Sequence, residues 1–284
     1  MPSRTSEASA ASSASRSRTS VVRATITYRS SPNPAASVLS VHADWTVADP
    51  ARFRASADAA LDLAEREDVL VTVGARATRP EVGYGYIVPG ERMGAGPARR
   101  IARFVEKPAA AEAERLIAGG ALWNTGMFAW TAGRFRAECE RHAPELAGGL
   151  PALDRGDVAA FYRAVKPVSV DVALYERTDR GAVLAGDFGW DDVGSWAALS
   201  RVRAADAAGN VVAGTAYAVD ATNCVVWSEE GATVVEGVTD LVVVRSRGVT
   251  LVTTRARAPY LKELLSRLPA GLVGEGGADG GERR

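Results

Sequence analysis

The sequence contains few of the side chains that bind soft metals or form nucleophilic triads. It has two histidines, His42 and His142, and two cysteines, Cys139 and Cys224. The cysteines lie far apart and lack the spacing of metal ligands, so we expect reduced thiols and a cytoplasmic protein. With two histidines in the whole chain, the sequence argues against a histidine-based zinc site or catalytic triad.

Long apolar runs and an excess of one charge are also lacking. No apolar run approaches the roughly 18 residues that a membrane span needs. Lys and Arg total 34, as do Asp and Glu, so we expect neither nucleic acid nor a membrane surface as a partner. A content of 47% hydrophobic and 24% charged residues is typical of a globular protein, and 284 residues suffice for one large or two smaller domains.

The two ends of the chain have biased compositions. Residues 1–36 contain no glycine, and Glu7 is their only acidic residue, whereas Ser, Ala and Arg are abundant. They lack the apolar core of a secretory signal, and although their composition resembles that of an organellar transit peptide, an unstructured extension is the more common interpretation. The sequence therefore predicts a disordered extension over 1–36 and a disordered glycine-rich tail over 271–284.

Strand and helix signals alternate between residues 37 and 204, which predicts an α/β domain over this range. Strands are expected at 37–41 and 69–73, and Asp49-Pro50 introduces an amphipathic helix over about 50–66 between them. This order favours parallel strands with helices packed over the sheet. Further strands are predicted at 83–87, 100–105 and 122–130, and further helices at 109–118, 132–141 and 169–177.

The pattern changes after residue 205. Short β-branched runs are separated by turn residues at near-regular intervals, and they end at a final helix predicted over 259–268. Such spacing is typical of a small β-roll or β-helix rather than of more α/β sheet. We therefore predict a second, C-terminal β domain over 205–270.

The motif Gly189-Trp190-Asp191-Asp192-Val193-Gly194-Ser195-Trp196 places two adjacent carboxylates in a turn after an apolar, strand-like run. Two interpretations of Asp192 are open from these residues alone. Mg²⁺ prefers hard oxygen ligands and takes only one or two from protein, so Asp192 could hold Mg²⁺ against a phosphate. Alternatively, Asp192 caps a helix that runs from Trp196 to Val202.

Five other motifs precede this turn in the chain. They are Ala43-Asp44, Gly83-Tyr84-Gly85-Tyr86-Ile87, Phe104-Val105-Glu106-Lys107-Pro108, Trp123-Asn124-Thr125-Gly126-Met127-Phe128 and Ser169-Val170-Asp171. Together the set closely resembles the sugar-phosphate nucleotidyltransferases, and among them most closely the mannose-1-phosphate guanylyltransferases. The resemblance extends from about Val38 to Leu268. It implies a Rossmann-like nucleotidyltransferase domain, with a mixed sheet and helices on both faces, followed by a small β-roll or β-helix.

The resemblance also implies a reaction. A guanylyl group would pass from GTP to mannose 1-phosphate, giving GDP-mannose and pyrophosphate. This chemistry requires positioning and charge neutralisation rather than a protein nucleophile. By resemblance, Asp44 and Asp192 hold Mg²⁺ between the two reacting phosphates. Lys107 neutralises the sugar phosphate.

Four further residues belong to the sugar pocket by resemblance. Glu106 and Asn124 would hydrogen-bond sugar hydroxyls, Gly85 would let the backbone approach the sugar ring, and Asp171 would support the pocket. Structural interpretations remain open for each residue taken alone. Glu106 and Lys107 could be a solvated pair at a sheet edge, Asn124 could satisfy a bulge, and Gly83 with Gly85 could mark a hairpin bend. The order of the motifs and their occurrence together in one chain favour the functional interpretation.

The chain departs from the family pattern in front of Asp44. Family members carry a glycine-rich loop there that wraps the triphosphate, and no counterpart precedes Asp44. His42 and Trp45 stand where the family usually has Pro and His. We therefore carry three hypotheses: a guanylyltransferase completed by an upstream start or by another chain, an impaired relic or regulatory sugar-phosphate-binding module, and a transferase for another sugar or nucleotide. The β domain could also pack against a second subunit, as in a homo-oligomer.

Overall fold

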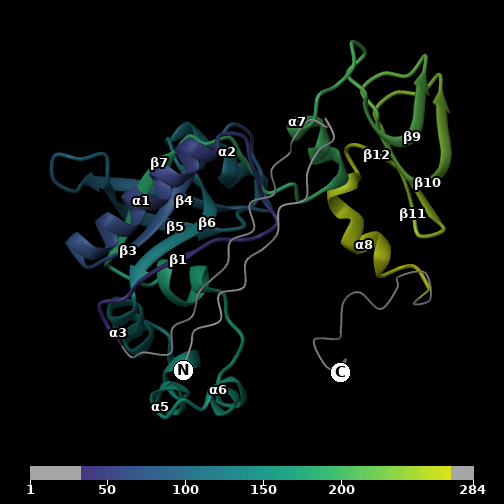
Figure 1. Ribbon diagram of the computed structural model, residues 1–284. Coiled ribbons are helices and arrows are strands. Elements are labelled where there is room, and N and C mark those ends of the chain that lie inside the picture. The colour runs from purple at the N-terminus through teal and green to yellow at the C-terminus, as the bar shows by residue number, and fades with distance from the viewer. Residues whose placement is uncertain (1–32, 270–284) are drawn as a thin grey trace, which may run out of the picture.

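The computed structural model describes residues 33–269, which form an α/β body and a separate four-stranded sheet (Figure 1). In Figure 1 the four-stranded sheet lies to one side of the body, with two short helices, α7 (Leu199–Val202) and α8 (Leu261–Leu265), between the two parts. The predicted tail over 271–284 and most of the predicted extension over 1–36 lie outside the described residues.

The body is built on a six-stranded mixed sheet with the strand order β1-β6-β3-β7-β5-β4. Its strands are β1 (Ser37–Ser40), β3 (Leu70–Arg76), β4 (Gly85–Arg92), β5 (Arg99–Glu106), β6 (Leu122–Thr131) and β7 (Gly181–Gly186). A parallel ladder joins β3 to β7, and the remaining ladders of this sheet are antiparallel. The predicted mixed sheet is confirmed.

The first strand–helix–strand unit has the predicted direction but not the simplest pairing. β1 and β3 run the same way, because the helix between them returns the chain to the starting edge. They are not neighbours, since β6 lies between them and is antiparallel to both. The two strands are thus parallel but not adjacent, because β6, which comes later in the chain, lies between them.

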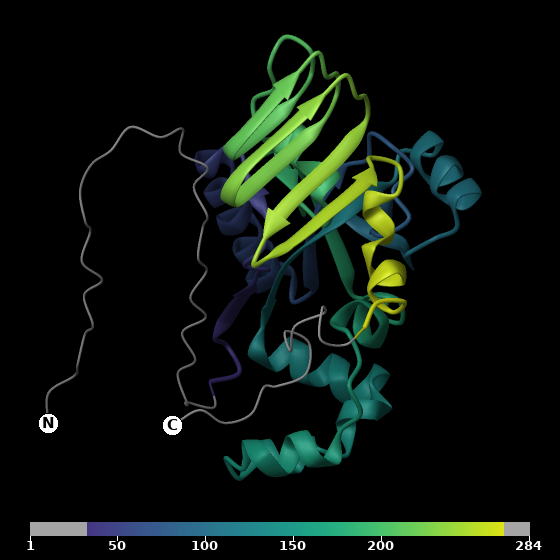
Figure 2. The same cartoon turned by 90° about the vertical axis from the view of Figure 1, so that its right-hand side faces the viewer.

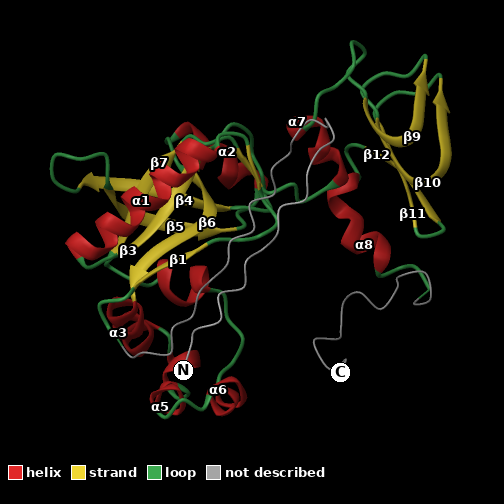
Figure 3. Cartoon of the chain, viewed as in Figure 1, coloured by secondary structure: helices red, strands yellow, loops and turns green. Residues whose placement is uncertain are grey.

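Helices cover both faces of the sheet, as Figure 3 shows. Helix α1 (Pro50–Glu67) packs on one face, and the opposite face carries α3 (Ala132–His142) and the single π-helical turn η1 (Asp171–Tyr175). Alternation along the strands produces these two cores: Met127 of β6 faces α1, and its neighbour Phe128 faces the other way. The N-cap predicted for α1 is confirmed, because Asp49 accepts the backbone N–H groups of Ala51 and Arg52, both at 3.0 Å.

The remaining helices of the body are short. They are α2 (Ala110–Ala118), α4 (Pro144–Ala147), α5 (Leu150–Asp154), α6 (Val158–Ala164) and the 3-10 turn η2 (Trp196–Ala198). Helix α2 was predicted, whereas α4, α5 and α6 were not. Prolines at the first turns of α4 and α5, with Gly148 and Gly149 between them, break the apolar periodicity on which such a prediction depends. The helix predicted over 169–177 is reduced to the π-helical turn η1.

The C-terminal sheet has the order β12-β11-β10-β9 and confirms a β-rich second part (Figure 2). Its strands are β9 (Val211–Val219), β10 (Val225–Glu236), β11 (Leu241–Ser246) and β12 (Val249–Thr254). β10 is parallel to both β9 and β11, and β12 is antiparallel to β11. The predicted final helix is divided into the 3-10 turn η3 (Ala258–Tyr260) and α8. No helix within residues 33–269 is long and apolar enough to cross a membrane.

A buried carboxylate ties α3 to the sheet. The side chain of Glu138 is 1% exposed, accepts a hydrogen bond from Thr178 Oγ1 at 2.5 Å and forms an ion pair with Arg134 at 3.2 Å. Arg134 also pairs with Asp68, at the start of β3. The network therefore connects α3 to the segments that enter β3 and β7. It compensates the charge that Glu138 carries into the interior.

We expect Glu138→Ala to lower the free energy of unfolding by about 3–5 kcal/mol, because it leaves Arg134 and Thr178 without their buried partner. Glu140→Ala on the same helix is the matched control. Glu140 is 52% exposed and pairs with Arg136 at 2.9 Å, so its removal should cost less than about 1 kcal/mol. Denaturant unfolding of both variants measures the difference, and equal losses would contradict the assigned role of Glu138.

Candidate functional site

A short ladder brings the two predicted magnesium aspartates to the same place. β2 (Thr46–Val47) pairs antiparallel with β8 (Trp190–Asp191), with Thr46 opposite Asp191. Extending this register by one residue sets Trp45 opposite Asp192, so Asp44 and Asp192 lie at the same end of the ladder. The rings of Trp45 and Trp190 pack edge to face, with centroids 6.2 Å apart. Asp44 is exposed in the bend just before β2.

The two adjacent carboxylates of the turn have different surroundings. Asp191 is 9% exposed and is held by Arg201, with its Oδ2 at 2.6 Å from Nε and its Oδ1 at 2.9 Å from Nη2. Asp191 Oδ1 also accepts the backbone N–H of Val193 at 2.9 Å. This carboxylate is neutralised within the protein. Asp192 is therefore the acidic side chain of the turn that remains for a ligand.

Asp192 does not cap the helix that follows it. Its Oδ1 accepts hydrogen bonds from the Tyr84 hydroxyl and from the backbone N–H of Gly194, the latter at 3.2 Å. The N-cap position of η2 is Ser195, whose side chain makes no capping hydrogen bond. The cap interpretation is thus wrong. The physical reason is that Asp192 is directed back across the turn toward β4 rather than along the chain toward Trp196.

Tyr84 is a site residue that the sequence did not single out. It is buried, and its ring lies edge-on to Trp123 and Trp190, both at 5.3 Å between centroids. Arg79 Nη2 donates to its hydroxyl at 3.3 Å. Burial, and then the hydrogen bond to Asp192, raise the pKa of Tyr84 far above its usual value, so the phenol stays protonated. The sequence signal that could have identified Tyr84 is its position directly before Gly85 in a predicted strand.

The sugar-pocket residues predicted from β4, β5 and β6 are adjacent. The β4–β5 ladder sets Gly85 opposite Glu106. A Cβ atom on Gly85 would lie 2.7 Å from Glu106 Oε2 and 3.3 Å from Asn124 Cβ. A side chain on Gly85 would therefore displace the Glu106 carboxylate and crowd Asn124. In this structure that space holds Glu106 itself, next to the surface where we expected a sugar ring.

Lys107 and Glu106 form an ion pair at 2.6 Å, as the solvated-pair interpretation expects. The Lys107 side chain is nevertheless 63% exposed and remains accessible to a ligand. Its backbone is left-handed, with φ of 49°, and its N–H donates to the Tyr84 carbonyl at 3.2 Å. An uncommon backbone conformation for a non-glycine residue, held by tertiary contacts, is frequent at functional positions.

Asn124 lies at the bulge in the β3–β6 ladder and also contacts a residue of the predicted sugar pocket. Its side chain is therefore placed for both predicted roles. The β3–β6 register shifts next to Asn124, and its Oδ1 accepts hydrogen bonds from Thr72 Oγ1 at 3.0 Å and from the Gly126 N–H at 3.3 Å. Its Nδ2 donates to Asp171 Oδ1 at 2.8 Å. Burial, together with the nearby charge of Glu106, raises the pKa of Asp171.

His42, which replaces the usual proline of the family motif, lies at the same pocket. A Cβ atom on Gly126 would be 3.0 Å from His42 Cε1. Gly126 has a φ of +74°, so both its conformation and the imidazole exclude a side chain. The drift from the family pattern therefore places a ring against the strand that carries Asn124.

The predicted residues form one band. Contacts connect Asp192 through Tyr84 to Lys107 and on to the sugar-pocket residues Glu106, Gly85, Asn124 and Asp171, whereas Asp44 is placed near Asp192 by the β2–β8 register alone. Within residues 33–269, no group of three or more His, Cys, Asp or Glu side chains could hold a metal ion. Two carboxylates with hard oxygens fit Mg²⁺, which keeps several waters and binds few protein ligands.

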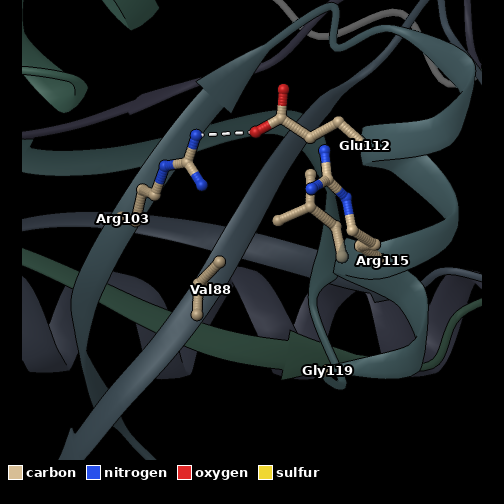
Figure 4. A pocket seen from close by; sticks show the side chains of 6 residues that line it. Val88, Arg103, Glu112, Arg115 and Gly119 are labelled. Atoms are coloured by element: carbon tan, nitrogen blue, oxygen red, sulfur yellow. Dashed lines mark hydrogen bonds and ion pairs between the residues drawn. The ribbon is translucent and has the colours of Figure 1, made fainter.

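A separate hollow of about 310 Å³ lies over β4, β5 and α2 (Figure 4). Its lining residues are Val88, Arg103, Glu112, Arg115, Leu116 and Gly119, none of which was predicted as a site residue. Arg103 and Glu112 are paired with each other at 2.7 Å. The hollow is distinct from the band of predicted site residues.

The family described as Nucleotidyl transferase matches residues 22–209. The chain is 37% identical to a mannose-1-phosphate guanylyltransferase of Escherichia coli (strain K12), over 85% of this chain and 53% of that protein. It is 34% identical to the alginate biosynthesis protein AlgA of Pseudomonas aeruginosa, over 82% of this chain and 50% of that protein. The chain thus spans about half the length of these curated relatives.

A solved structure has the same fold. A crystal structure described as a mannose-1-phosphate geranyltransferase from Thermus thermophilus superposes with a TM-score of 0.76 at 35% identity. The similarity covers 81% of this chain and 69% of that one. The family match and the solved structure agree with the mixed α/β sheet. The chain belongs to the nucleotidyl transferase family.

Proposed function

We propose that this chain catalyses guanylyl transfer from GTP to mannose 1-phosphate, giving GDP-mannose and pyrophosphate. The observation that carries the proposal is the band from Asp44 and Asp192, through Lys107, to Glu106 and Asn124. It would align a cation for the sugar phosphate and two carboxylates for a metal with the polar side chains that we expect around the sugar. The names of the similar proteins, mannose-1-phosphate guanylyltransferases, supply the sugar and the nucleotide.

The proposed reaction is an in-line displacement. An oxygen of mannose 1-phosphate attacks the α-phosphorus of GTP, a new P–O bond forms, and the bond to pyrophosphate breaks. Lys107 neutralises the phosphate of the sugar, and the ion pair with Glu106 keeps its ammonium group beside the carboxylate that would bind a sugar hydroxyl. Glu106 and Asn124 hydrogen-bond sugar hydroxyls, while Asp171 orients the Asn124 amide. These contacts act by holding the nucleophile in line rather than by covalent catalysis.

We propose Asp44 and Asp192 as the residues that would hold Mg²⁺. Within residues 33–269, the Oδ1 atom of Asp192 accepts two hydrogen bonds, and no donor contacts its Oδ2 atom. One oxygen is therefore available to a cation while the other fixes the carboxylate. When bound, Mg²⁺ would supply charge neutralisation for the two reacting phosphates. The chain contributes the position of the two carboxylates at the end of the β2–β8 ladder.

Two further expectations belong to the same proposal. We infer that the C-terminal sheet is part of a small β-helix, and the support is the successive parallel pairing of β9 with β10 and of β10 with β11. A parallel bridge from Thr222 to Thr239 continues the stacking between strands. We also expect a cytoplasmic enzyme, because GTP and sugar phosphates are intracellular metabolites, and a homo-oligomer remains a prediction.

Pyrophosphate release from GTP, mannose 1-phosphate and Mg²⁺ by the purified chain tests the proposed function. We expect turnover, with Asp192→Ala reducing kcat by at least about 100-fold, because a charge at the reacting phosphates is lost. Asp187→Ala is the matched control, since Asp187 lies in the segment between β7 and β8, is 94% exposed and pairs with Arg52 on the surface. Binding of mannose 1-phosphate without any turnover would instead support the sugar-phosphate-binding module.

Lys107→Ala should weaken the binding of mannose 1-phosphate by about 1.5–3 kcal/mol, which is roughly 10- to 150-fold in Kd. A charge-assisted contact to the phosphate is lost, while Glu106 and Asn124 stay in place. Titration calorimetry with mannose 1-phosphate measures this loss without requiring turnover. Lys262→Ala on α8 is the control for removing a lysine elsewhere. An unchanged Kd in Lys107→Ala would refute the role of Lys107.

A further inference from the structure

The Tyr84 phenol is fixed in a rigid setting. Its ring packs against two tryptophans, Trp123 and Trp190, at 89° and 66° to their planes. The Arg79 guanidinium lies 4.7 Å from the Trp123 ring and 5.8 Å from the Tyr84 ring. Such edge-to-face and cation–π contacts restrict the ring. The hydroxyl therefore has one well-defined position.

The Tyr84 hydroxyl sets the orientation of the Asp192 carboxylate. An aspartate carboxyl rotates broadly about its last torsion, so without partners its two oxygens exchange places easily. Here the Tyr84 hydroxyl and the Gly194 N–H donate to the same oxygen, Oδ1. The other oxygen, Oδ2, lies over Gly194, where a Cβ atom would be only 2.7 Å away. The arrangement therefore determines that Oδ1 accepts the hydrogen bonds and that Oδ2 is the oxygen left for a ligand.

The direction of the hydrogen bond is also fixed. Arg79 Nη2 donates to the Tyr84 oxygen at 3.3 Å, which leaves the phenol proton for Asp192. Tyr84 is therefore the donor and Asp192 the acceptor in this hydrogen bond. A carboxylate that accepts hydrogen bonds on one oxygen keeps its other oxygen for a cation.

The backbone of Tyr84 reaches the second charged group of the site. Its carbonyl accepts the N–H of Lys107 at 3.2 Å, at the point where the Lys107 backbone is left-handed. The residue that precedes β4 is thus bonded both to the carboxylate assigned to the metal and to the segment that carries the lysine assigned to the sugar phosphate. The relative position of these two charges is set through Tyr84.

We propose that Tyr84 is a positioning residue, whose hydroxyl fixes the Asp192 carboxylate so that Oδ2 is presented to a divalent cation. The inference rests on the proposed function for the identity of the reaction, but the geometry concerns cation binding and is testable without turnover. Tyr84 itself touches neither substrate nor metal. Its effect on catalysis passes through Asp192.

Tyr84→Phe removes the hydroxyl and keeps the ring against its tryptophans. Tyr86→Phe is the matched control, because Tyr86 is two residues further along the same segment and fully buried. Its hydroxyl bonds backbone groups rather than Asp192: the N–H and carbonyl of Glu81 at 2.9 Å and 3.0 Å, and the carbonyl of Arg79 at 3.4 Å. The full chain is titrated with Mn²⁺ in the presence of mannose 1-phosphate, and water-proton relaxation reports the bound ion. Pyrophosphate release as a function of Mg²⁺ concentration and thermal unfolding are measured in parallel.

We expect Tyr84→Phe to weaken Mn²⁺ binding by about 10- to 100-fold, the usual effect of losing a residue that orients a metal ligand. The half-saturating Mg²⁺ concentration should rise and kcat should fall, while the KM for mannose 1-phosphate stays near the wild-type value. Tyr86→Phe should leave Mn²⁺ affinity unchanged, whatever it does to thermal stability.

The outcomes separate the two proposals. Equal Mn²⁺ affinities for wild type and Tyr84→Phe, equal losses in Tyr84→Phe and Tyr86→Phe, or no Mn²⁺ binding by wild type would each overturn the role of Tyr84. If the wild-type chain releases no pyrophosphate but Tyr84→Phe still loses Mn²⁺ affinity selectively, the positioning role stands and the proposed function fails.

Discussion

The site depends on the two-residue ladder between β2 and β8. It joins the turn after β1 to the turn that follows β7, and it carries Asp44 and Asp192 to one end. Backbone pairing continues at the other end of the ladder, where the N–H of Ala48 donates to the Gly189 carbonyl at 3.1 Å. The edge-to-face contact of Trp45 with Trp190 adds aromatic packing. Backbone pairing and aromatic packing together position the segments that carry the two charged groups.

Around this ladder the structure assigns different tasks to neighbouring carboxylates. Arg201 donates hydrogen bonds to both carboxylate oxygens of Asp191. Asp192, in contrast, has one oxygen that accepts no hydrogen bond from residues 33–269. Val193, which follows, has a φ of 49°, an outlier for a β-branched residue that costs roughly 1–3 kcal/mol. The bond from its N–H to Asp191 helps to hold that conformation. The turn stores strain where the proposed chemistry needs a fixed carboxylate.

Much of the fold could be predicted, and the failures have identifiable causes. Helix α1 was predicted with its cap, because an aspartate followed by proline and a regular apolar face acts locally. Helices α4 and α5 were missed because each is only a turn long and has a proline or glycine at its ends. The cap proposed for Asp192 was wrong because a partner next to β4, remote in sequence, competes for its oxygen. A local capping signal fails to predict the structure where a donor remote in sequence forms the hydrogen bond instead.

The sequence by itself determined the order and chemical type of the site residues, the helices with strong local signals and the family, because these depend on composition, spacing and motifs along the chain. The tertiary structure alone decided that β6 separates β1 from β3, that Arg201 neutralises Asp191, and that Tyr84 orients Asp192. Each of these depends on strand register and side-chain packing between segments far apart in sequence. Such contacts form only when the whole sheet assembles, and no local pattern encodes them.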